Sequence, residues 1–285
     1  MEHHKSRPGT RREIGRHFSI SPLVDVFLTI AFNLNFIYAI SQRDLISKYK
    51  GAFLGILWMV GTPIALVLAY GFMTIVVFNS RFGSSNAYES LIALWFCITL
   101  WQTFAEIVSR SAGIMEDNVA LIKRTPFPLY CLSPAVVLTS LTGLFVSYTL
   151  GFILHVITLG VPPLSWLAIP IVITPLIITG LALSYLMATI GVFIRDIRYI
   201  LPLLMTMGML ISPVLYPADV IPQSLRFITD LNPFGHVFEA LRSAISGTGL
   251  IFTNPLIIVG LASITLLCAT FSLFKKFSSE FTDVL

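Results

Sequence analysis

The segment LAIPIVITPLIITGLALSYLMATIGVF, residues 167–193, decides the fold class of this chain. It contains no Asp, Glu, Lys or Arg, and the same holds for the whole run 125–194. An α-helix needs about 20 apolar residues to cross a hydrocarbon core about 30 Å thick. The run is too long for one crossing, and GVPP at residues 160–163 divides it into two. These features predict an all-α integral membrane protein.

The composition favours the same class. Of the 285 residues, 56% are hydrophobic and 11% are charged, whereas a soluble domain has about 25% charged residues. So little charge cannot cover so much apolar surface in water, and we expect lipid to be part of the solvent. Cys97, Cys131 and Cys268 are scattered through apolar segments without metal-ligand or disulfide spacing. They are interpreted as small hydrophobic residues.

Six crossings are predicted along the chain, within a transmembrane domain over 51–276 that a tail over 277–285 follows. The predicted spans are 52–78, 88–112, 134–159, 167–193, 199–216 and 251–274. The second span must extend past Glu106 towards Arg110. These two residues stand at i and i+4, so they share a helix face and can form an ion pair near the membrane edge.

The distribution of Lys and Arg predicts the orientation. With six crossings, both termini lie on one side, and about fifteen of the 18 Lys and Arg residues fall on that side. The other side keeps Arg81, Arg226 and Arg242. Because cytoplasmic loops are rich in Lys and Arg, both termini are predicted to be cytoplasmic.

The segment 26–50, which follows a basic tail over 1–25, does not fit a simple crossing. Its apolar residues recur at helical spacing, and polar residues occupy the other face. We expect a helix in the cytoplasmic membrane interface, with Arg43, Lys48 and Lys50 near lipid phosphates. A signal peptide and a seventh span are the alternatives. The long tail and the polar interruptions disfavour the first, and the charge distribution disfavours the second.

The segment 217–249 is too polar to cross and too apolar for a free loop. Pro222 and Pro233 divide it into two short helical pieces, and Glu239 and Arg242 stand at i and i+3, where they can pair. We expect re-entrant helices that enter the outer leaflet against other parts of the protein, where the broken backbone finds partners.

Sequence motifs for catalysis are absent. The chain has no G-x-x-x-x-G-K-[ST], H-E-x-x-H, G-x-S-x-G or C-x-x-C motif, so we predict no catalytic residue, no metal ligand and no P-loop for ATP. The middle of each predicted span lacks acidic residues, which disfavours coupling to protons or sodium. His155 is either a proton relay or, as we favour, a hydrogen-bonded packing residue. The basic tail is expected to meet anionic lipid rather than nucleic acid.

Aromatic residues make up 12% of the chain, and many lie inside predicted spans. Each of them can simply pack against lipid or against the core. Alternatively, they form a smooth pore wall, because aromatic faces stack on the C–H faces of sugar rings without fixing any one ring. The candidates for such a wall are Trp58, Tyr70, Phe72, Phe96 and Phe104.

Several blocks of the sequence resemble the permease subunits of type-2 ABC exporters for polysaccharides. Residues 43–58, RDLISKYKGAFLGILW, are similar to the R-x-K-G-S-x-L-G-x-L-W stretch at the first span of those proteins, with Ala in place of the commoner Ser. Residues 118–134 resemble their loop between spans two and three. Residues 195–216 resemble their fourth-to-fifth span region, and residues 231–242, which begin with LNPF, resemble the stretch before their last span.

The resemblance implies a homodimeric permease bound to two copies of a cytoplasmic ABC ATPase subunit. ATP and Mg²⁺ would bind to that subunit, so this chain would need no cofactor. The implied substrate is an undecaprenyl-diphosphate-linked glycan exported across the bacterial cytoplasmic (inner) membrane. O-antigen is favoured over capsule or teichoic acid because residues 43–63 look closer to O-antigen permeases. The alternatives are a small-molecule or drug exporter of the same superfamily, and a membrane-embedded enzyme for lipid-linked sugars, whose clustered acidic or histidine residues are missing.

The resemblance also implies roles for particular residues. A coupling helix docked on the ATPase would contain Asn118, Leu121, Ile122, Lys123, Arg124 and Phe127. The interface helix would meet the diphosphate of the lipid carrier, or only anchor to anionic lipid, through Arg43, Lys48 and Lys50. The periplasmic mouth of the pore would be closed by a gate that includes Asn232, Pro233, Phe234, Glu239 and Arg242.

Overall fold

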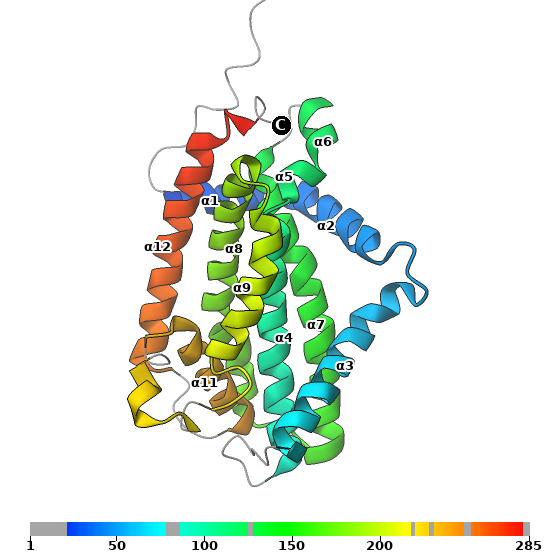
Figure 1. Ribbon diagram of the computed structural model, residues 1–285, viewed down its shortest axis with the longest axis vertical. Helices are drawn as coiled ribbons and strands as arrows, with labels where there is room; N and C mark the ends of the chain where they lie inside the picture. Colours follow the sequence, from blue (N-terminus) through cyan, green and yellow to red (C-terminus); the bar gives the residue numbers. More distant parts are fainter. Residues whose placement is uncertain are drawn as a thin grey trace, which may run out of the picture.

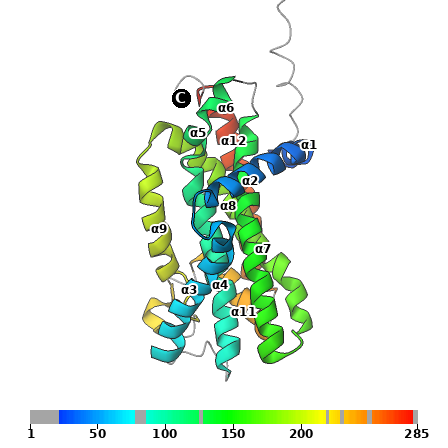
Figure 2. The ribbon, with the colours of Figure 1, turned by 90° about the vertical axis from the view of Figure 1, so that its right-hand side faces the viewer.

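The computed structural model describes residues 22–77, 86–124, 128–217, 220–227, 231–247 and 252–281. Within these ranges every regular element is helical, which confirms the predicted all-α class. Residues 1–21 of the predicted basic tail lie outside them, and so does Phe127. Figures 1 and 2 show long helices that run side by side, with shorter helices lying across both ends of the bundle.

Four helical segments in the described ranges are long and apolar enough to cross a membrane, by length and composition. Their main helices are α4 (Ala87–Ser111), α7 (Leu132–Leu159), α8 (Ile169–Phe193) and α12 (Asn254–Phe277). In α4, 78% of the most apolar stretch is buried inside the protein, compared with 33% in α12. α4 is therefore the central helix of the bundle, and α12 lies at its edge.

Two further apolar helices are shorter. α3 (Trp58–Gly71) follows the 3₁₀ turn η1 (Gly55–Leu57) and continues into the π-helical turn η2 (Phe72–Val77). α9 (Ile197–Ile211) has 15 residues and ends before the limit predicted at residue 216. It ends because Ser212 precedes a proline, which disfavours helical dihedrals, and Ser212 is extended with ψ 146°. The six-span arrangement therefore stays a prediction.

The connection between α7 and α8 lies at the predicted GVPP break. Gly160 has φ +84° and ψ −147°, a backbone conformation suited to glycine. His155 is 4% exposed there. Its Nδ1 atom lies 3.3 Å from the carbonyl oxygen of Gly160, and its ring packs on Trp166 with centroids 4.6 Å apart. These contacts agree with a packing role for His155.

The segment predicted as one interfacial helix over 26–50 is divided into two helices. α1 (Pro22–Phe32) and α2 (Leu34–Tyr49) meet at Asn33 with a bend of 71°. The Nδ2 atom of Asn33 donates to the carbonyl oxygen of Thr29 at 2.8 Å, which satisfies a carbonyl group at the end of α1. Figures 1 and 2 show both helices lying across one end of the bundle.

At the other end of the bundle lies α11 (Pro233–Ser246), which packs against α4, α8 and α12. Pro233 is the first helical residue, where its missing N–H group is not needed. Asn232 is the N-cap, and its Oδ1 atom accepts from the backbone N–H of Phe234 at 3.0 Å. Between Pro217 and α11, the described helical residues are Val220, the turn η6 (Gln223–Leu225) and the two residues after it. Whether this region enters a membrane stays a prediction.

One close approach fixes α8 against the turn that follows α4. A Cβ atom at Gly191 would overlap the carbonyl oxygen of Ala112 and lie 2.8 Å from its carbonyl carbon. The two backbones can meet this closely because position 191 has no side chain, as is common where membrane helices pack through small residues.

Candidate functional site

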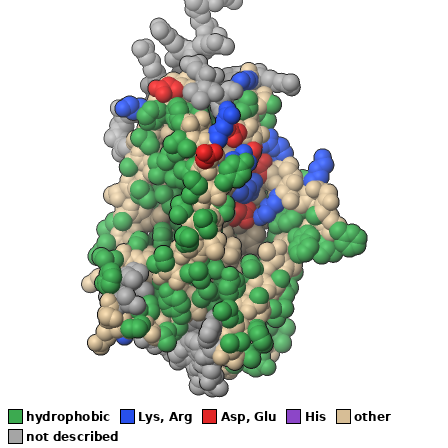
Figure 3. Space-filling model, viewed as in Figure 1, with side chains coloured by type: hydrophobic (Ala, Val, Ile, Leu, Met, Phe, Trp, Pro, Cys, Tyr) green, Lys and Arg blue, Asp and Glu red, His purple; other side chains and the backbone are tan. Residues whose placement is uncertain are grey.

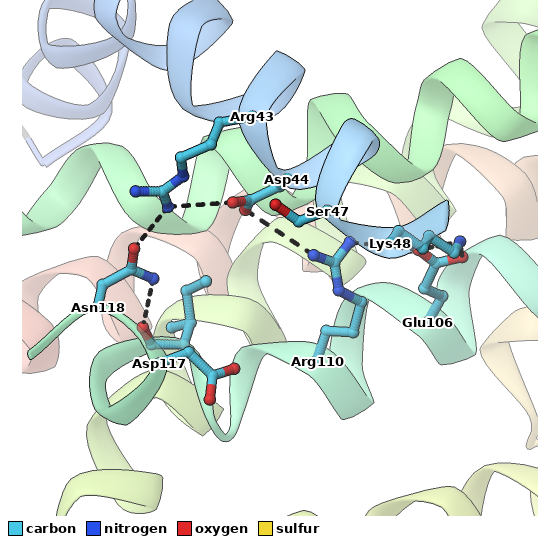
Figure 4. Close-up of a pocket in the computed structure, with 9 residues that line it drawn as sticks. Arg43, Asp44, Ser47, Lys48, Glu106, Arg110, Asp117 and Asn118 are labelled. Carbon is cyan, nitrogen blue, oxygen red and sulfur yellow. Dashed lines mark hydrogen bonds and ion pairs between the residues drawn. The ribbon is translucent and has the colours of Figure 1, made fainter. Parts of the chain in front are cut away.

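Charged side chains gather in one open cavity of about 580 Å³ near α2. Figure 3 shows them around a hollow in a face that is otherwise mainly hydrophobic, and Figure 4 shows how they lie. The lining comes from α2, from the end of α4, and from α5 (Ile114–Asp117) with the residue that follows it. Its charged residues are Arg43, Asp44, Lys48, Glu106, Arg110 and Asp117.

Ion pairs in this charged cavity connect α2 with α4. The Nζ atom of Lys48 lies 2.8 Å from both carboxylate oxygens of Glu106. Arg110 Nη1 lies 3.4 Å from Glu106 Oε1, which confirms the ion pair predicted from their spacing. Arg110 Nη2 also lies 3.8 Å from Asp44 Oδ2. Because an unpaired carboxylate in an apolar helix is costly, these two cations explain how α4 can carry Glu106.

Arg43 connects α2 with the segment after α5. Its Nη2 atom donates to Asn118 Oδ1 at 2.6 Å and to Asp44 Oδ1 at 3.1 Å. Asn118 is 5% exposed, and its Nδ2 atom donates to the carbonyl oxygen of Ile114 at 2.8 Å, which fixes the amide. Arg43, which was predicted to contact lipid head groups, thus bonds to Asn118, which was predicted to take part in ATPase coupling. Lys50, the third residue predicted for lipid head groups, is exposed beyond the end of α2.

Two further cavities continue from the charged cavity along α4. One of about 360 Å³ lies between α3, α4 and α9, and one of about 170 Å³ lies between α3, α4 and α7. Glu106 lines all three cavities, while Thr62, Leu66 and Gln102 line both of the smaller ones. The three cavities therefore adjoin one another along α4, and together we call them the α4 groove.

The face of α4 that lines this groove carries many polar residues, although the helix as a whole is apolar. The polar residues on it recur at helical spacing, and they are Thr99, Gln102, Thr103, Glu106, Ser109 and Arg110. Thr99 and Thr103 each donate to the carbonyl oxygen four residues earlier, at 2.8 and 2.9 Å. Their hydroxyl oxygens keep acceptor capacity for a ligand. Sequence reasoning missed this stripe because averaged hydropathy hides it, whereas the i, i+3, i+4, i+7 spacing would have revealed it.

The aromatic candidates for a pore wall have different positions. Trp58 and Tyr70 line the α4 groove. Phe72, on η2, is 62% exposed and lies outside the groove lining as defined above. Trp101, which was not among the candidates, lines the 360 Å³ cavity, and its Nε1 atom donates to the carbonyl oxygen of Met205 at 3.1 Å.

The other two aromatic candidates lie in the core of the chain. Phe96 is 2% exposed and packs on Tyr148 with ring centroids 4.3 Å apart. Phe104 is 3% exposed and packs on Phe234 at 5.2 Å. Phe234 was predicted as a gate residue, and here it joins α11 to the centre of α4.

Apart from Phe127, which lies outside the described residues, the predicted coupling residues lie on or just before α6 (Val119–Arg124). α6 projects from the end of the bundle (Figure 1). Ile122 is 6% exposed and belongs to the core cluster around the ends of α7, α8 and α12, whereas Leu121 is half-buried and Lys123 is exposed. The Ile122 contact attaches α6 to the bundle. Arg124 ends the helix.

A second group of ion pairs connects the loop after α8 to α5. Arg195 Nε lies 2.9 Å from Glu116 Oε1, and Arg198 Nη1 lies 3.2 Å from Glu116 Oε2. Arg198 Nη2 also lies 3.9 Å from Asp117 Oδ1. The first turn of α9 is therefore joined to the helix that immediately precedes Asn118 and α6.

At the other end of α9, Arg242 bonds to the backbone instead of to Glu239. Its guanidinium is in a residue only 9% exposed, and Nη2 donates to the carbonyl oxygens of Pro213, Val214 (3.0 Å) and Tyr216 (3.1 Å). The ion pair that the i, i+3 spacing allowed is not formed between these two described residues, and Glu239 is exposed. The backbone after α9 is no longer helical, so its carbonyl groups lack helical hydrogen-bond partners. The Arg242 guanidinium donates to these carbonyl groups instead of pairing with Glu239.

Residues 35–246, which run from α2 to the end of α11, match the model of the ABC-2 type transporter family. This chain belongs to the ABC-2 type transporter family. The match contains the charged cavity, α6, α9 and Arg242, and it confirms the family resemblance stated from the sequence.

Curated relatives of this ABC-2 chain extend over most of its length. The O-antigen export system permease protein RfbA of Myxococcus xanthus is 28% identical over 244 residues, which cover 85% of this chain and 92% of that protein. Two proteins of the same name from Klebsiella pneumoniae are 26% and 25% identical over 265 residues, covering 90% of this chain and 99% of each. The chain is thus a multi-pass ABC-2 membrane protein related to permease subunits for O-antigen export.

Proposed function

We propose that this ABC-2 chain is the transmembrane permease subunit of an ATP-driven exporter of a lipid-linked polysaccharide, with O-antigen as the favoured glycan. The transport runs from the cytoplasm to the periplasm across the bacterial inner membrane. The observation that carries the proposal is the α4 groove, which joins a charged cavity to a polar stripe flanked by Trp58 and Tyr70. The names of the relatives support the substrate class.

The charged cavity suits the diphosphate of an undecaprenyl carrier. Arg43, Lys48 and Arg110 supply cations there, and Glu106 and Asp44 hold them in place when no substrate is bound. An incoming diphosphate competes with Glu106 for Lys48, because a phosphate oxygen and a carboxylate oxygen accept the same charge-assisted hydrogen bonds. The alternative role of these cations is to anchor α2 to anionic lipid.

The rest of the α4 groove suits a glycan. The hydroxyl and amide groups on α4 exchange hydrogen bonds with sugar hydroxyls, while Trp58 and Tyr70 offer apolar faces to the rings. Such contacts are weak enough individually for a polymer to slide. At the periplasmic end, Asn232, Phe234 and Arg242 hold α11 against the bundle as the gate.

The partners follow from the same proposal. The chain works as a homodimer with two copies of a cytoplasmic ABC ATPase, which binds ATP and Mg²⁺. Lys123 and Leu121 on α6 contact that ATPase, because α6 projects beyond the bundle at the end where α1 and α2 lie (Figure 1). The chain crosses the membrane six times, and both termini are cytoplasmic.

The test is co-expression with the ABC ATPase subunit of the proposed exporter, followed by purification in detergent. We expect a complex with ATPase activity, and we expect Lys123→Asp combined with Arg124→Asp to break or uncouple it. Lys276→Asp, at an exposed residue of α12 that forms no ion pair in the described ranges, is the control for the charge change and leaves the complex intact. A chain that purifies alone despite co-expression would contradict the proposal. Transport of a short amphiphile but not of a lipid-linked glycan would favour a small-molecule exporter.

A further inference from the structure

α9 packs loosely along its length. Leu201 and Met209 are 5% and 3% exposed, whereas Tyr199 and Leu203 are 74% and 56% exposed. α9 contacts the central helix α4 mainly around one residue, Trp101. There the indole of Trp101 bonds to the backbone of α9, and a Cβ atom at Gly208 would lie only 3.0 Å from that ring.

α9 is also one wall of the α4 groove. Pro202, Met205, Thr206 and Met209 line the 360 Å³ cavity opposite α3 and α4. The width of this cavity therefore depends on where α9 lies. A helix with few buried side chains can change its position at low cost, because little close packing has to be broken.

Both ends of α9 are held by arginine side chains. At the end near α5, Arg195 and Arg198 share the two carboxylate oxygens of Glu116, at 2.9 and 3.2 Å. At the other end, Arg242 of α11 holds the carbonyl groups of the segment after α9. α9 is thus held at both ends by arginine side chains, and between them mainly by the narrow contact with Trp101.

Glu116 is the acidic residue that Arg195 and Arg198 share. Arg198 also lies over Gly113, where an added Cβ atom would be 3.3 Å from its guanidinium carbon. The position of α5 therefore sets the position of the first turn of α9. α5 is followed, through Asn118, by α6.

We propose that α9 is the movable wall of the α4 groove and that Glu116 is the positioning residue that passes a displacement of α5 and α6 to it. The inference rests on the proposed function, since the displacement comes from an ATPase bound to α6. Because Arg242 holds the far end, a shift at Glu116 tilts α9 and does not carry the whole helix away. Tilting changes the separation between α9 and α4, most near Arg198 and less near Met209, and with it the opening of the groove.

One experiment tests, without any ATPase, whether Glu116 holds the start of α9 in place. A spin label at Tyr199→Cys, with Cys97, Cys131 and Cys268 changed to Ala, reports the mobility of the start of α9 in lipid vesicles. We expect Glu116→Gln and, separately, Arg198→Gln to raise that mobility. Asp196→Asn is the matched control, because its exposed carboxylate lies in the same loop and forms no ion pair in the described ranges. If mobility is unchanged in both variants, or rises as much in the control, the inference is overturned.

A second experiment uses the complex with the ATPase. Gln102→Cys and Met209→Cys replace side chains whose Nε2 and Sδ atoms lie 3.9 Å apart, so cross-linking measures the distance between α9 and α4. We expect the cross-linking rate to depend on ATP, and Glu116→Gln to abolish that dependence. We also expect this variant to lower glycan export by about tenfold, a typical size for coupling between sites, while ATP hydrolysis continues.

The conservative variant Glu116→Asp keeps a carboxylate for Arg195 and Arg198 and is expected to retain part of the ATP dependence. Retention of the ATP dependence in Glu116→Gln would overturn the inference. If the unmodified complex shows no ATP dependence because no ATPase binds, the proposed function fails, and the spin-label experiment still decides whether Glu116 positions α9. Folding is not at risk in these variants, because partly exposed ion pairs contribute little stability.

Discussion

Gly191 lies where α8 passes the turn between α4 and α5, and the missing side chain sets the distance between the two backbones there. An added Cβ atom would meet the carbonyl group of Ala112, which is backbone and cannot rotate away. Accommodating it requires the helices to separate, and the buried contacts around them are then lost.

We expect Gly191→Ala to lower the free energy of unfolding by about 1–3 kcal/mol, the usual cost of overpacking a close contact. The measurement is thermal unfolding of the purified chain in detergent. Gly143→Ala on α7 is the matched control, because an added Cβ atom there meets no atom within 4 Å. Its effect should be within about 1 kcal/mol, since Ala is the better helix former. Equal melting temperatures for both variants would contradict this account.

Single residues also show where reasoning from the sequence stops. The Glu106–Arg110 ion pair was predictable because both residues belong to one helix turn. The same rule allowed a Glu239–Arg242 pair, but the partners of Arg242 come from the segment after α9, some 28 positions earlier in the chain. Spacing within a helix says nothing about competing acceptors from another element.

At the scale of elements, the long helices were the most predictable part of the chain. Their positions follow from hydropathy, because the thickness of a bilayer demands long uninterrupted apolar helices. The bend at Asn33 and the early end of α9 were not predicted. Both depend on local backbone chemistry, namely a side-chain hydrogen bond in one case and a residue before proline in the other.

The contact between α9 and α4 gives a prediction of its own. Gly208→Ala places a Cβ atom about 3 Å from the Trp101 indole and pushes the C-terminal part of α9 outwards. We expect slower cross-linking between Cys residues at positions 102 and 209, without loss of the folded chain. Adding Trp101→Phe, which shortens the ring system, should restore part of the rate. A rate unaffected by Gly208→Ala would show that α9 does not rest on Trp101.

At the scale of the whole molecule, the α4 groove brings together α2, α3, α4, α7 and α9. Arg43, Lys48, Glu106 and Arg110 were noticed in the sequence, but their convergence was not. Arg43 and Asn118 are 75 positions apart, and only the fold brings them together. The aromatic residues show the same limit. The sequence offered five aromatic candidates for a pore wall. Only the packing shows that Trp58 lines the groove whereas Phe96 is a core residue.

The groove predicts which aromatic residues matter for transport. We expect Trp58→Ala and Tyr70→Ala to slow polysaccharide export severalfold, because each removes a stacking face worth about 0.5–1.5 kcal/mol. Phe145→Ala is the control, because Phe145 is 74% exposed on α7 and lies outside the groove lining. Export is measured in proteoliposomes, with recovery of the ATPase complex checked for each variant. Normal export in both groove variants would remove them from the transport path.

The close approach of Gly191 to Ala112 also has a mechanical consequence. With backbone against backbone, α8 leaves the turn before α5 no space to slide, so the turn can act only as a pivot. A displacement of α6, such as the proposed ATPase would cause, then swings α5 about this pivot as a short lever arm, and Glu116 lies on that arm. A side chain at position 191 would shift the pivot itself, and the same displacement of α6 would then move α9 through a different arc.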